Sequence, residues 1–453
     1  MTSHETRPGG LTAQTTGTTT DRDGDAPSVL ARRRLPDASS DPLLRAADPV
    51  AAAEEHVAAT ALRETPPGHE GGGRVGLELE MHLVDLERPG RRPIWDEVRR
   101  LVHDLPALPM GSSVTVEPGG QVELSTPPAD DVVLSIAALG IDRDHLRRGL
   151  AAAGFGAAPL GTDPARPVRR VNPAPRYSAM ERHFDALGCA GAGKAMMSAT
   201  AALQVNLDAG PEAEWSSRMA HLRAMVPVLV AASSTSPYLA GEASGWHSMR
   251  QGVWQGIDHG RSDPFPSGPP AAAWAAYALD APVMLVLDDG VLRPVTERVR
   301  FRDWLSGDAL FSRPAVQADL DYHLTTLFPP VRPRGYLELR CLDALPDRWW
   351  PAMTALTVTL VDDPVAADLA AEIVAPVHDR WETAAREGLA DPAARRAVLG
   401  CVELALSRGP VELRSELVAL HDLFARGSSP AQELRDRIDA VGPLAVLLEE
   451  ARA

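Results

Sequence analysis

Four segments of the chain alternate apolar and polar residues with the two-residue period of a β-strand, and this pattern constrains the fold most. They cover residues 74–86, 113–125, 200–208 and 335–342. Because successive side chains of a strand point to opposite faces, each segment packs one apolar face and presents a polar one. The second segment has Pro118, Gly119 and Gly120 at its middle, which predicts a hairpin turn. A fifth segment, 282–287, is apolar throughout and predicts a buried strand.

Most of the remaining chain has helical periodicity. It predicts helices over 41–62, 95–105, 130–153, 176–187, 211–232 and 271–279, and almost continuously from about residue 347 to the end. Strands in the middle with helices clustered after them predict an α+β fold with an antiparallel sheet. Residues 1–40 are rich in Thr, Gly, Asp and Ser and predict a disordered tail, so we expect one domain over 41–453.

Charge and cysteine content exclude several classes of protein. With 61 acidic and 45 basic residues the net charge is −16, which excludes general nucleic-acid binding because phosphate contacts need basic patches. Cys189, Cys341 and Cys401 lie too far apart for a zinc motif, and their odd number argues against a disulfide framework. We find neither a signal peptide nor an apolar run long enough to span a membrane, and expect a cytoplasmic protein without membrane partners. The sequence leaves the oligomeric state open.

The polar faces of the predicted strands carry acidic residues at regular spacing. Glu78 and Glu80 lie two apart, Glu117 and Glu123 flank the predicted turn, and Glu338 has an arginine two residues later. Carboxylates gathered on one face repel one another unless cations bind between them, and Mg²⁺ or Mn²⁺ favour oxygen ligands. From spacing alone, a metal site and an ordinary solvated face both remain open.

One segment resembles a phosphate-binding loop without matching it fully. Residues 188–194 fit the pattern GxxxxGK, but Ala195 follows where that motif needs Ser or Thr, and a helix-periodic segment precedes it. We therefore reject a P-loop fold and expect a Gly-rich loop that carries Lys194, the only lysine of the chain, as a phosphate contact or as an exposed residue. The sequence contains neither HExxH nor GxSxG, which argues against a zinc hydrolase or a serine hydrolase.

Six motifs together resemble the glutamate–cysteine ligase family, in particular its bacterial ergothioneine-pathway (EgtA-type) branch. They are GLELE at 76–80, VEPGGQVELS at 116–125, ALQVNLD at 202–208, SPYLAG at 236–241, SMRQGVW at 248–254 and GYLELRCLD at 335–343. The resemblance implies a glutamine synthetase-like fold, in which a curved antiparallel sheet cradles the active site, surrounded by helices, with a helical C-terminal region. It also implies an ATP-dependent ligase whose partners are the small molecules glutamate, cysteine and ATP.

The resemblance further implies a role for each polar residue. The γ-carboxylate of glutamate must be activated as a γ-glutamyl phosphate before the cysteine amine attacks it, so metal ions and arginines are needed against the phosphate charge. The implied ligands of Mg²⁺ (or Mn²⁺) are Glu78, Glu80, Glu117, Glu123, Glu338 and Gln204, of which Gln204 stands where some branches of the family carry a His. Arg340 is the implied contact of the transferred phosphate, and Arg250 of the glutamate α-carboxylate. Asn206 and Gln121 would orient substrate or water, and Lys194 would contact ATP.

Two alternatives to this function stay open. The same scaffold could join a different amine or acid, because the sequence does not reveal the cysteine pocket. A catalytically inactive relative would be expected to lack the acidic ligands or Arg340, and here all of them are present.

Overall fold

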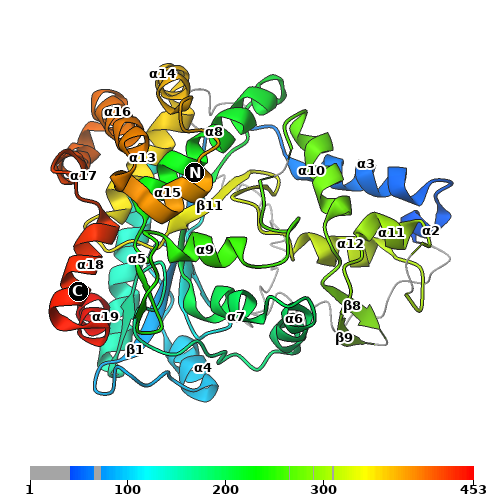
Figure 1. The fold of residues 1–453 in the computed structure, drawn as a ribbon, viewed down its shortest axis with the longest axis horizontal. Coiled ribbons are helices and arrows are strands. Elements are labelled where there is room, and N and C mark those ends of the chain that lie inside the picture. The colour runs from blue at the N-terminus through cyan, green and yellow to red at the C-terminus, as the bar shows by residue number, and fades with distance from the viewer. Residues whose placement is uncertain (1–40, 66–72, 265, 289, 309–310) are drawn as a thin grey trace, which may run out of the picture.

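An antiparallel sheet built around the long strand β1 (Val75–Asp85) lies at the centre of the computed structural model, which describes residues 41–65, 73–264, 266–288, 290–308 and 311–453 (Figure 1). The predicted tail, 1–40, lies outside the described residues. The strand order is β10 (Val331–Pro333), β11 (Leu337–Asp343), β5 (Ala202–Leu207), β1, β3 (Val122–Ser125) and β2 (Ser113–Val116), and β4 (Phe155–Ala158) pairs with the second half of β1.

All the strand pairs of this sheet are antiparallel, and their register decides which polar residues become neighbours. Glu78 pairs with Gln204, and Glu80 pairs with Glu123. Asn206 pairs with Glu338 on its other side. Because directly opposed residues of adjacent strands project to the same face, the acidic and amide side chains of four strands share one face. The predicted α+β class and the predicted hairpin of β2 and β3 are both confirmed.

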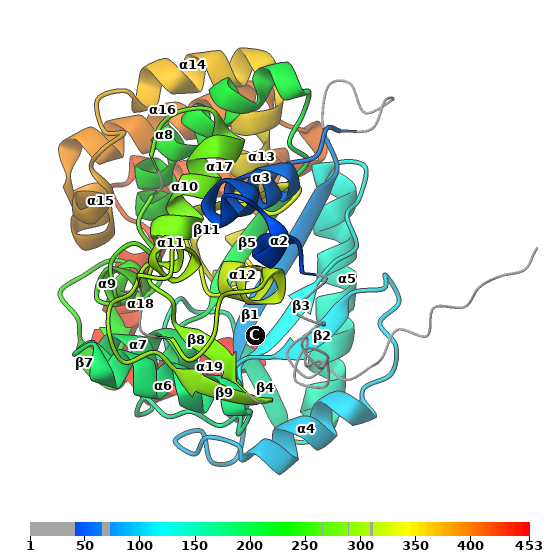
Figure 2. The same ribbon diagram turned by 90° about the vertical axis from the view of Figure 1, so that its right-hand side faces the viewer.

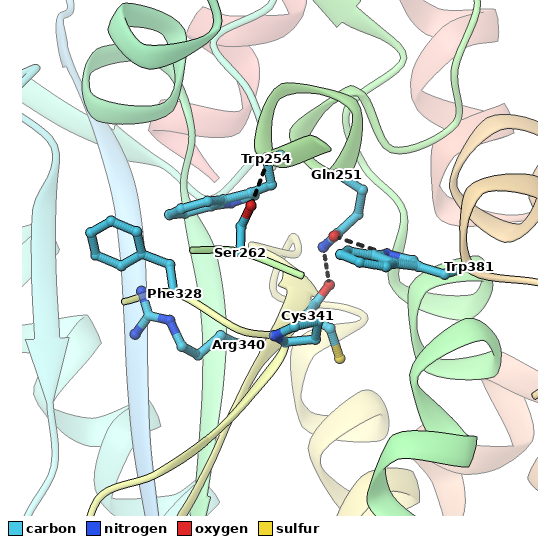
Figure 3. A pocket seen from close by; sticks show the side chains of 8 residues that line it. Gln251, Trp254, Ser262, Phe328, Arg340, Cys341 and Trp381 are labelled. Carbon is cyan, nitrogen blue, oxygen red and sulfur yellow. Dashed lines mark hydrogen bonds between the residues drawn. The ribbon is translucent and has the colours of Figure 1, made fainter. Parts of the chain in front are cut away.

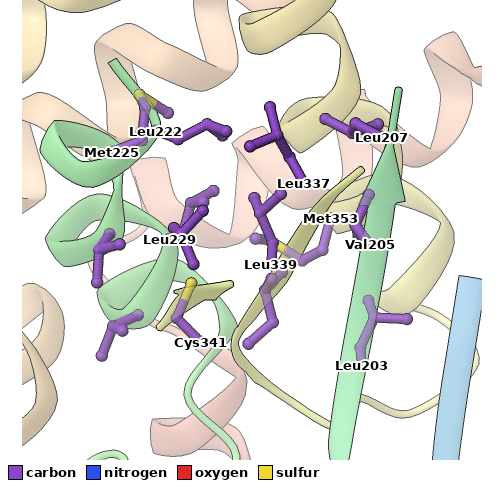
Figure 4. Packing of buried hydrophobic residues seen from close by; sticks show 14 of the residues in the cluster. Leu203, Val205, Leu207, Leu222, Met225, Leu229, Leu337, Leu339, Cys341 and Met353 are labelled. Atoms are coloured by element: carbon purple, nitrogen blue, oxygen red, sulfur yellow. The ribbon is translucent and has the colours of Figure 1, made fainter. Parts of the chain in front are cut away.

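The opposite face of the sheet forms the main hydrophobic core. Apolar residues of β5 and β11, including Leu203, Val205 and Leu339, point toward α8 (Trp215–Ser233) and α13 (Trp350–Asp362), as Figure 4 shows. Helix α5 (Val132–Ala152) lies along β1 and β4 (Figure 2). The apolar half of each alternating segment is thus buried against helices, which fixes the orientation of the polar half.

Helices make up most of the rest of the chain. They are α2 (Pro42–Arg45), α3 (Pro49–Ala61), α4 (Trp95–Asp104), α6 (Pro175–Ala186), α7 (Ala190–Ala199), α9 (Met249–Gln255), α10 (Pro270–Asp280), α11 (Phe301–Leu305), α12 (Gln317–Leu324), α14 (Pro364–Val374), α15 (Trp381–Glu387), α16 (Pro392–Arg408), α17 (Arg414–Ala425), α18 (Pro430–Val441) and α19 (Pro443–Arg452). Asp48, Asp363 and Asp391 each cap a helix whose first residue is proline, accepting hydrogen bonds from backbone amides of the first turn. Within the described ranges, no helix is long and apolar enough to cross a membrane.

A smaller lobe lies beside the β10 edge of the sheet, on the right of Figure 1. It contains α2, α3, α10, α11, α12 and a two-stranded ribbon, β8 (Leu285–Asp288) with β9 (Val291–Pro294). The apolar segment at 282–287 therefore supplies a strand of this separate ribbon and not of the main sheet. Pro333, which has no amide proton to donate, sits in β10 at the edge of the main sheet, where such a residue is tolerated.

The Gly-rich segment around Lys194 is helical, so the predicted loop there is wrong. Residues 190–199 form α7, which packs on α6. A Cβ at Gly193 would lie 2.3 Å from the ring of Phe184, so the glycine permits a close approach of the two helices and does not mark a loop. Lys194 lies on the exposed side of α7.

Candidate active site

The polar face of the sheet brings together most of the predicted site residues. Glu78 and Glu80 come from β1, Gln204 and Asn206 from β5, Glu338 and Arg340 from β11, Glu123 from β3, and Glu117 from the turn that follows β2. The apolar residues that alternate with them are buried beneath, in the core of Figure 4. Side chains more than 250 residues apart in the sequence therefore meet on one surface.

Short hydrogen bonds orient the carboxylates of β1 and β3. The Asn206 amide donates to Glu78 at 3.0 Å. The backbone amide of Ala202 donates to Glu80 at 2.9 Å, and the Gln204 amide donates to the other oxygen of Glu80 at 3.3 Å. Thr115 and Ser125 each donate a hydroxyl to Glu123. Glu117, by contrast, has no side-chain hydrogen bond to another described residue.

The same four carboxylates are held where their negative charge is unfavourable. Burial, together with the charges of Glu123 and Glu338, raises the pKa of Glu78 to about 7. Burial and the charge of Glu80 raise the pKa of Glu123 to about 7. The pKa of Glu117 is raised well above its ordinary value by burial and by its acidic neighbours, and burial raises the pKa of Glu80. A cation bound among them would relieve both the repulsion and the loss of solvation.

Glu338 differs from these four because arginines already neutralise its charge. Its side chain is 0% exposed, and Arg332 binds it with two hydrogen bonds of 2.5 and 2.9 Å. Arg340 lies 3.3 Å from one carboxylate oxygen and Arg334 lies 3.4 Å from the other. Burial alone would raise the pKa of Glu338, but Arg332 and Arg340 hold it at about 2. Glu338 thus gathers three guanidinium groups at the edge of the face.

An irregularity in β11 sets the direction of Arg340. Leu339 pairs with Val205 and Leu342 with Leu203, so two residues of β11, Arg340 and Cys341, lie opposite Gln204 alone. Arg340 donates to the Gln204 amide oxygen at 2.6 Å, while its buried Nε has no hydrogen-bond partner. The backbone carbonyls of both bulged residues accept hydrogen bonds from side chains of α9.

Arg250 lies in the first turn of α9, above the bulge. It is 2% exposed and donates from Nη2 to the carbonyl of Arg340 at 2.9 Å. Its Nη1 is buried without a hydrogen-bond partner, 4.0 Å from Asp343. Burial lowers the pKa of Arg250, against the attraction of Asp343 and Glu80. A buried guanidinium with an unsatisfied donor suits an anionic group of a substrate.

Two predicted residues are placed differently from the rest. Gln121 is buried and donates to the backbone carbonyl of Thr200 at 2.8 Å, which ties the β2–β3 turn to the chain just before β5. Lys194 lies exposed on α7, and the structure gives it no hydrogen bond or ion pair to another described residue. Their substrate and ATP roles stay predictions.

A narrow cavity opens beside Arg340 (Figure 3). Trp254, Phe328 and Trp381 line it together with Gln251, Ser262, Pro330, Arg340 and Cys341. The Gln251 amide donates to the carbonyl of Cys341 at 2.7 Å and accepts from the Trp381 indole at 3.2 Å. Trp254 both lines this cavity and packs against Phe328 and the second hydrophobic cluster.

The sequence reasoning missed Arg332 and Arg334, although a signal was present. Arg332 lies in β10 and Arg334 directly follows the strand, so the two have the same two-residue spacing as Glu338 and Arg340 in the next strand. Both also line a cleft between β10 and the smaller lobe, whose other lining residues are Thr60, Trp274, Asp321, Leu324, Thr325 and Pro333. The three-arginine cluster around Glu338 thus lies between the acidic face and this cleft.

The sequence matches a known family over this whole region. The model of glutamate–cysteine ligase family 2 (GCS2) matches residues 74–450. The chain belongs to this family. It is 49% identical over 404 residues to glutamate–cysteine ligase EgtA of Mycolicibacterium smegmatis, an alignment that covers 88% of this chain and 94% of that protein. It is also 49% identical over 397 residues to EgtA of Mycobacterium tuberculosis, covering 86% of this chain and 91% of that one.

More distant members of the glutamate–cysteine ligase group agree in sequence and in fold. The chloroplastic glutamate–cysteine ligase of Arabidopsis thaliana is 30% identical over 285 residues, which cover 61% of this chain and 53% of that one. The crystal structure of glutamate–cysteine ligase from Francisella tularensis, solved in complex with AMP, superposes with a TM-score of 0.51 at 13% identity, covering 86% of this chain and 89% of that one. The predicted α+β fold is that of a glutamate–cysteine ligase.

Proposed function

We propose that this chain joins the γ-carboxylate of glutamate to the amine of cysteine at the expense of ATP, giving γ-glutamylcysteine, ADP and phosphate. The observation that carries the proposal is the juxtaposition on one sheet face of buried, mutually repelling carboxylates with Arg340 and Arg250. An ATP-dependent ligase needs this combination, because it must hold cations, phosphate and a carboxylate substrate together. The relatives at 49% identity that are named glutamate–cysteine ligase support this choice of substrates.

The donor set fits Mg²⁺ or Mn²⁺. Glu78, Glu80, Glu117 and Glu123 supply oxygen ligands whose charge is unfavourable without a cation. In the described part of the chain no three acidic, His or Cys side chains meet closely enough to form a complete metal site. Mg²⁺ commonly takes one or two protein carboxylates and completes its shell with substrate phosphates and water, so a subset of the four carboxylates would suffice. Bound there, it would offset the negative charge of the ATP phosphates.

Glu338 and Gln204 would then act differently from the four other predicted ligands. Both already contact Arg340, and Glu338 is held by Arg332 as well. We propose that they hold Arg340 against the site, where its unpartnered Nε faces the transferred phosphate. A direct bond from either residue to a metal ion would require these arginine contacts to loosen.

Different residues of the chain then act on different groups of the substrates. Arg250 binds the α-carboxylate of glutamate and so fixes the γ-carboxylate for attack on the terminal phosphate of ATP. Arg340 stabilises the charge on the phosphoryl group as it moves to that carboxylate. Asn206 holds Glu78 in place from the neighbouring strand. The cysteine amine next attacks the activated carbonyl carbon and phosphate leaves, so the protein needs no nucleophile of its own.

We assign the nucleotide to the cleft beside β10. Arg334 reaches only one oxygen of Glu338, at 3.4 Å, and its side chain is 59% exposed, so further donors remain for phosphate. Arg332 lines the same cleft. Lys194, on the exposed side of α7, is a separate candidate contact of ATP.

The deciding experiment supplies purified protein with ATP, Mg²⁺, glutamate and cysteine. We expect ADP release that depends on both amino acids, and γ-glutamylcysteine by mass spectrometry. Absence of such release refutes the proposal. A panel of amines in place of cysteine tests the alternative ligase, which a strong preference for another amine would favour. We further propose that the reaction takes place in the cytoplasm and feeds ergothioneine biosynthesis, so that a strain without this chain should lose ergothioneine.

A further inference from the structure

The end of β11 carries a buried carboxylate to which none of the preceding roles applies. Asp343 is the last residue of the strand and its side chain is 1% exposed. One oxygen accepts the backbone amide of Thr235 at 2.9 Å and the hydroxyl of Ser236 at 2.6 Å. The other accepts the hydroxyl of Ser248 at 2.8 Å. A buried carboxylate with three short hydrogen bonds is a rigid anchor.

The groups that Asp343 holds are those that start α9. Ser248 caps this helix, and its oxygen accepts the backbone amide of Gln251 at 3.3 Å. The hydroxyl oxygen of Ser236 accepts the backbone amide of Arg250 at 3.1 Å. Each serine thus donates to Asp343 and accepts from the helix, so two continuous hydrogen-bond chains run from the carboxylate into the first turn of α9.

That first turn carries the two side chains that reach back to the bulge of β11. Arg250 donates to the carbonyl of Arg340, and Gln251 donates to the carbonyl of Cys341 beside the cavity of Figure 3. Strand and helix are therefore joined at two levels, by side chains of α9 at the bulge and by Asp343 at the strand end. Both carbonyls belong to the bulge, where the regular pairing of β11 with β5 is interrupted.

We infer that Asp343 is a positioning residue for substrate binding, which fixes the Arg250 guanidinium through Ser236 and Ser248 and through its own 4.0 Å contact with Nη1. The inference rests on the proposed function in one respect, that Arg250 binds the acid substrate. A short helix such as α9, of seven residues, has little stability of its own, so its direction depends on these tertiary hydrogen bonds. Movement of its first turn shifts Arg250 and Gln251 together.

Close packing around Asp343 offers an independent way to disturb it. A Cβ at Gly161 would lie 2.5 Å from the Asp343 carboxylate. The Gly161 amide also donates to the hydroxyl oxygen of Thr235 at 3.0 Å. Gly161→Ala should therefore displace Asp343 without altering its chemistry.

The test compares Asp343→Asn, Ser236→Ala, Ser248→Ala and Gly161→Ala with Ser234→Ala. Ser234 is a buried serine of the same loop whose hydroxyl bonds the carbonyl of Val230 and not Asp343. We expect the KM for glutamate to rise about tenfold in the four test variants, the usual effect of losing one hydrogen bond to a charged group. The KM for ATP should stay near the wild-type value in these variants. In the Ser234→Ala control, the KM for glutamate should also stay near the wild-type value. Ser248→Thr keeps a hydroxyl, so its KM for glutamate should be much closer to the wild-type value than that of Ser248→Ala.

Two further measurements separate positioning from general destabilisation. The double variant Asp343→Asn with Ser248→Ala should be no worse than Asp343→Asn alone, because both changes break one chain of hydrogen bonds. Hydrogen exchange at the amides of Arg250 and Gln251 should accelerate in each test variant while exchange in the core of α8 is unchanged. If Asp343→Asn does not fold, the serine variants carry the same test.

Equal KM values for glutamate in wild type and all test variants, with unchanged exchange in α9, would overturn the inference. So would a uniform fall in kcat with a lowered melting temperature and no change in KM. If wild-type protein shows no glutamate-dependent ADP release, the proposed function fails, while the exchange measurement still decides whether Asp343 positions α9.

Discussion

Replacing Glu78 by glutamine should stabilise the metal-free protein while it abolishes ligase activity. Glutamine keeps the shape of the side chain and an oxygen that accepts the hydrogen bond from Asn206. It removes the charge that burial and the carboxylates of Glu123 and Glu338 make unfavourable. Active sites that hold like charges together commonly gain stability in this way when the function is removed.

The size of the gain follows from the pKa of Glu78. In the folded protein it is about 7, against 4.5 for an ordinary glutamate, so ionisation at higher pH costs the folded state about 3 kcal/mol. Solvent partly reaches Glu78 and screens its charge, so about 3 kcal/mol is the upper end of the expected gain in stability. A folded pKa above the unfolded one means that the cost is fully present above pH 7 and is lost as the pH falls to 4.5. For about 400 ordered residues, 3 kcal/mol is a shift of about 4 °C in melting temperature.

The assay records the melting temperatures of Glu78→Gln and of the wild type from pH 4.5 to above pH 7. A chelator keeps both proteins free of metal. Burial lowers the pKa of His82 and His247 to about 4 and of His323 to about 3, so these histidines destabilise the protein as the pH falls below 6.5. They contribute equally to both proteins, and the difference between the two curves isolates Glu78. Glu55→Gln, at an exposed position of α3, is the matched control.

We expect a gain above pH 7 that disappears near pH 4.5 and that shrinks when Mg²⁺ is added, because the ion binds the wild type more tightly than the variant and stabilises it more. A Glu78→Gln protein that is less stable than wild type at high pH, or a gain independent of pH, would refute the reasoning.

Four further changes test the rest of the site. Arg340→Ala should lower kcat by about 10²- to 10³-fold in the ADP-release assay, whereas Arg408→Ala, on an exposed ion pair of α16, should leave it unchanged. Arg332→Met leaves the Glu338 charge buried without its main partner, so the free energy of unfolding measured by urea titration should fall by about 3 kcal/mol. This loss of stability should shrink as the pH falls from 4.5 toward 2, because Glu338 then takes up a proton. A loss that does not vary with pH would contradict the ion-pair explanation. Arg334→Ala should raise the KM for ATP and not that for glutamate, and an unchanged KM for ATP would remove the nucleotide from the cleft. Lys194→Ala decides whether that lysine contacts ATP: a raised KM for ATP supports the contact, and unchanged kinetics shows that Lys194 is only an exposed residue of α7.

The sequence by itself determined the alternating strands of the main sheet, the sidedness of the sheet and the family, but not the short strands β4 and β10. Two-residue alternation at 74–86, 200–208 and 335–342 fixed which side chains are buried, because apolar burial against helices leaves the acidic residues on the other face. Family motifs then named Glu78, Arg250 and Arg340. These signals are local, because each lies within a single strand, hairpin or helix.

Only the tertiary structure decided how those residues are paired and held. Strand register placed Glu80 against Glu123, and the bulge of β11 turned Arg340 toward Gln204. Contacts between segments that are distant in sequence tied Asp343 to α9. The Gly-rich stretch around Lys194 was misjudged for the same reason: glycine permits a turn or a close helix contact equally well in sequence, and the packing of Gly193 on Phe184 selects the helix.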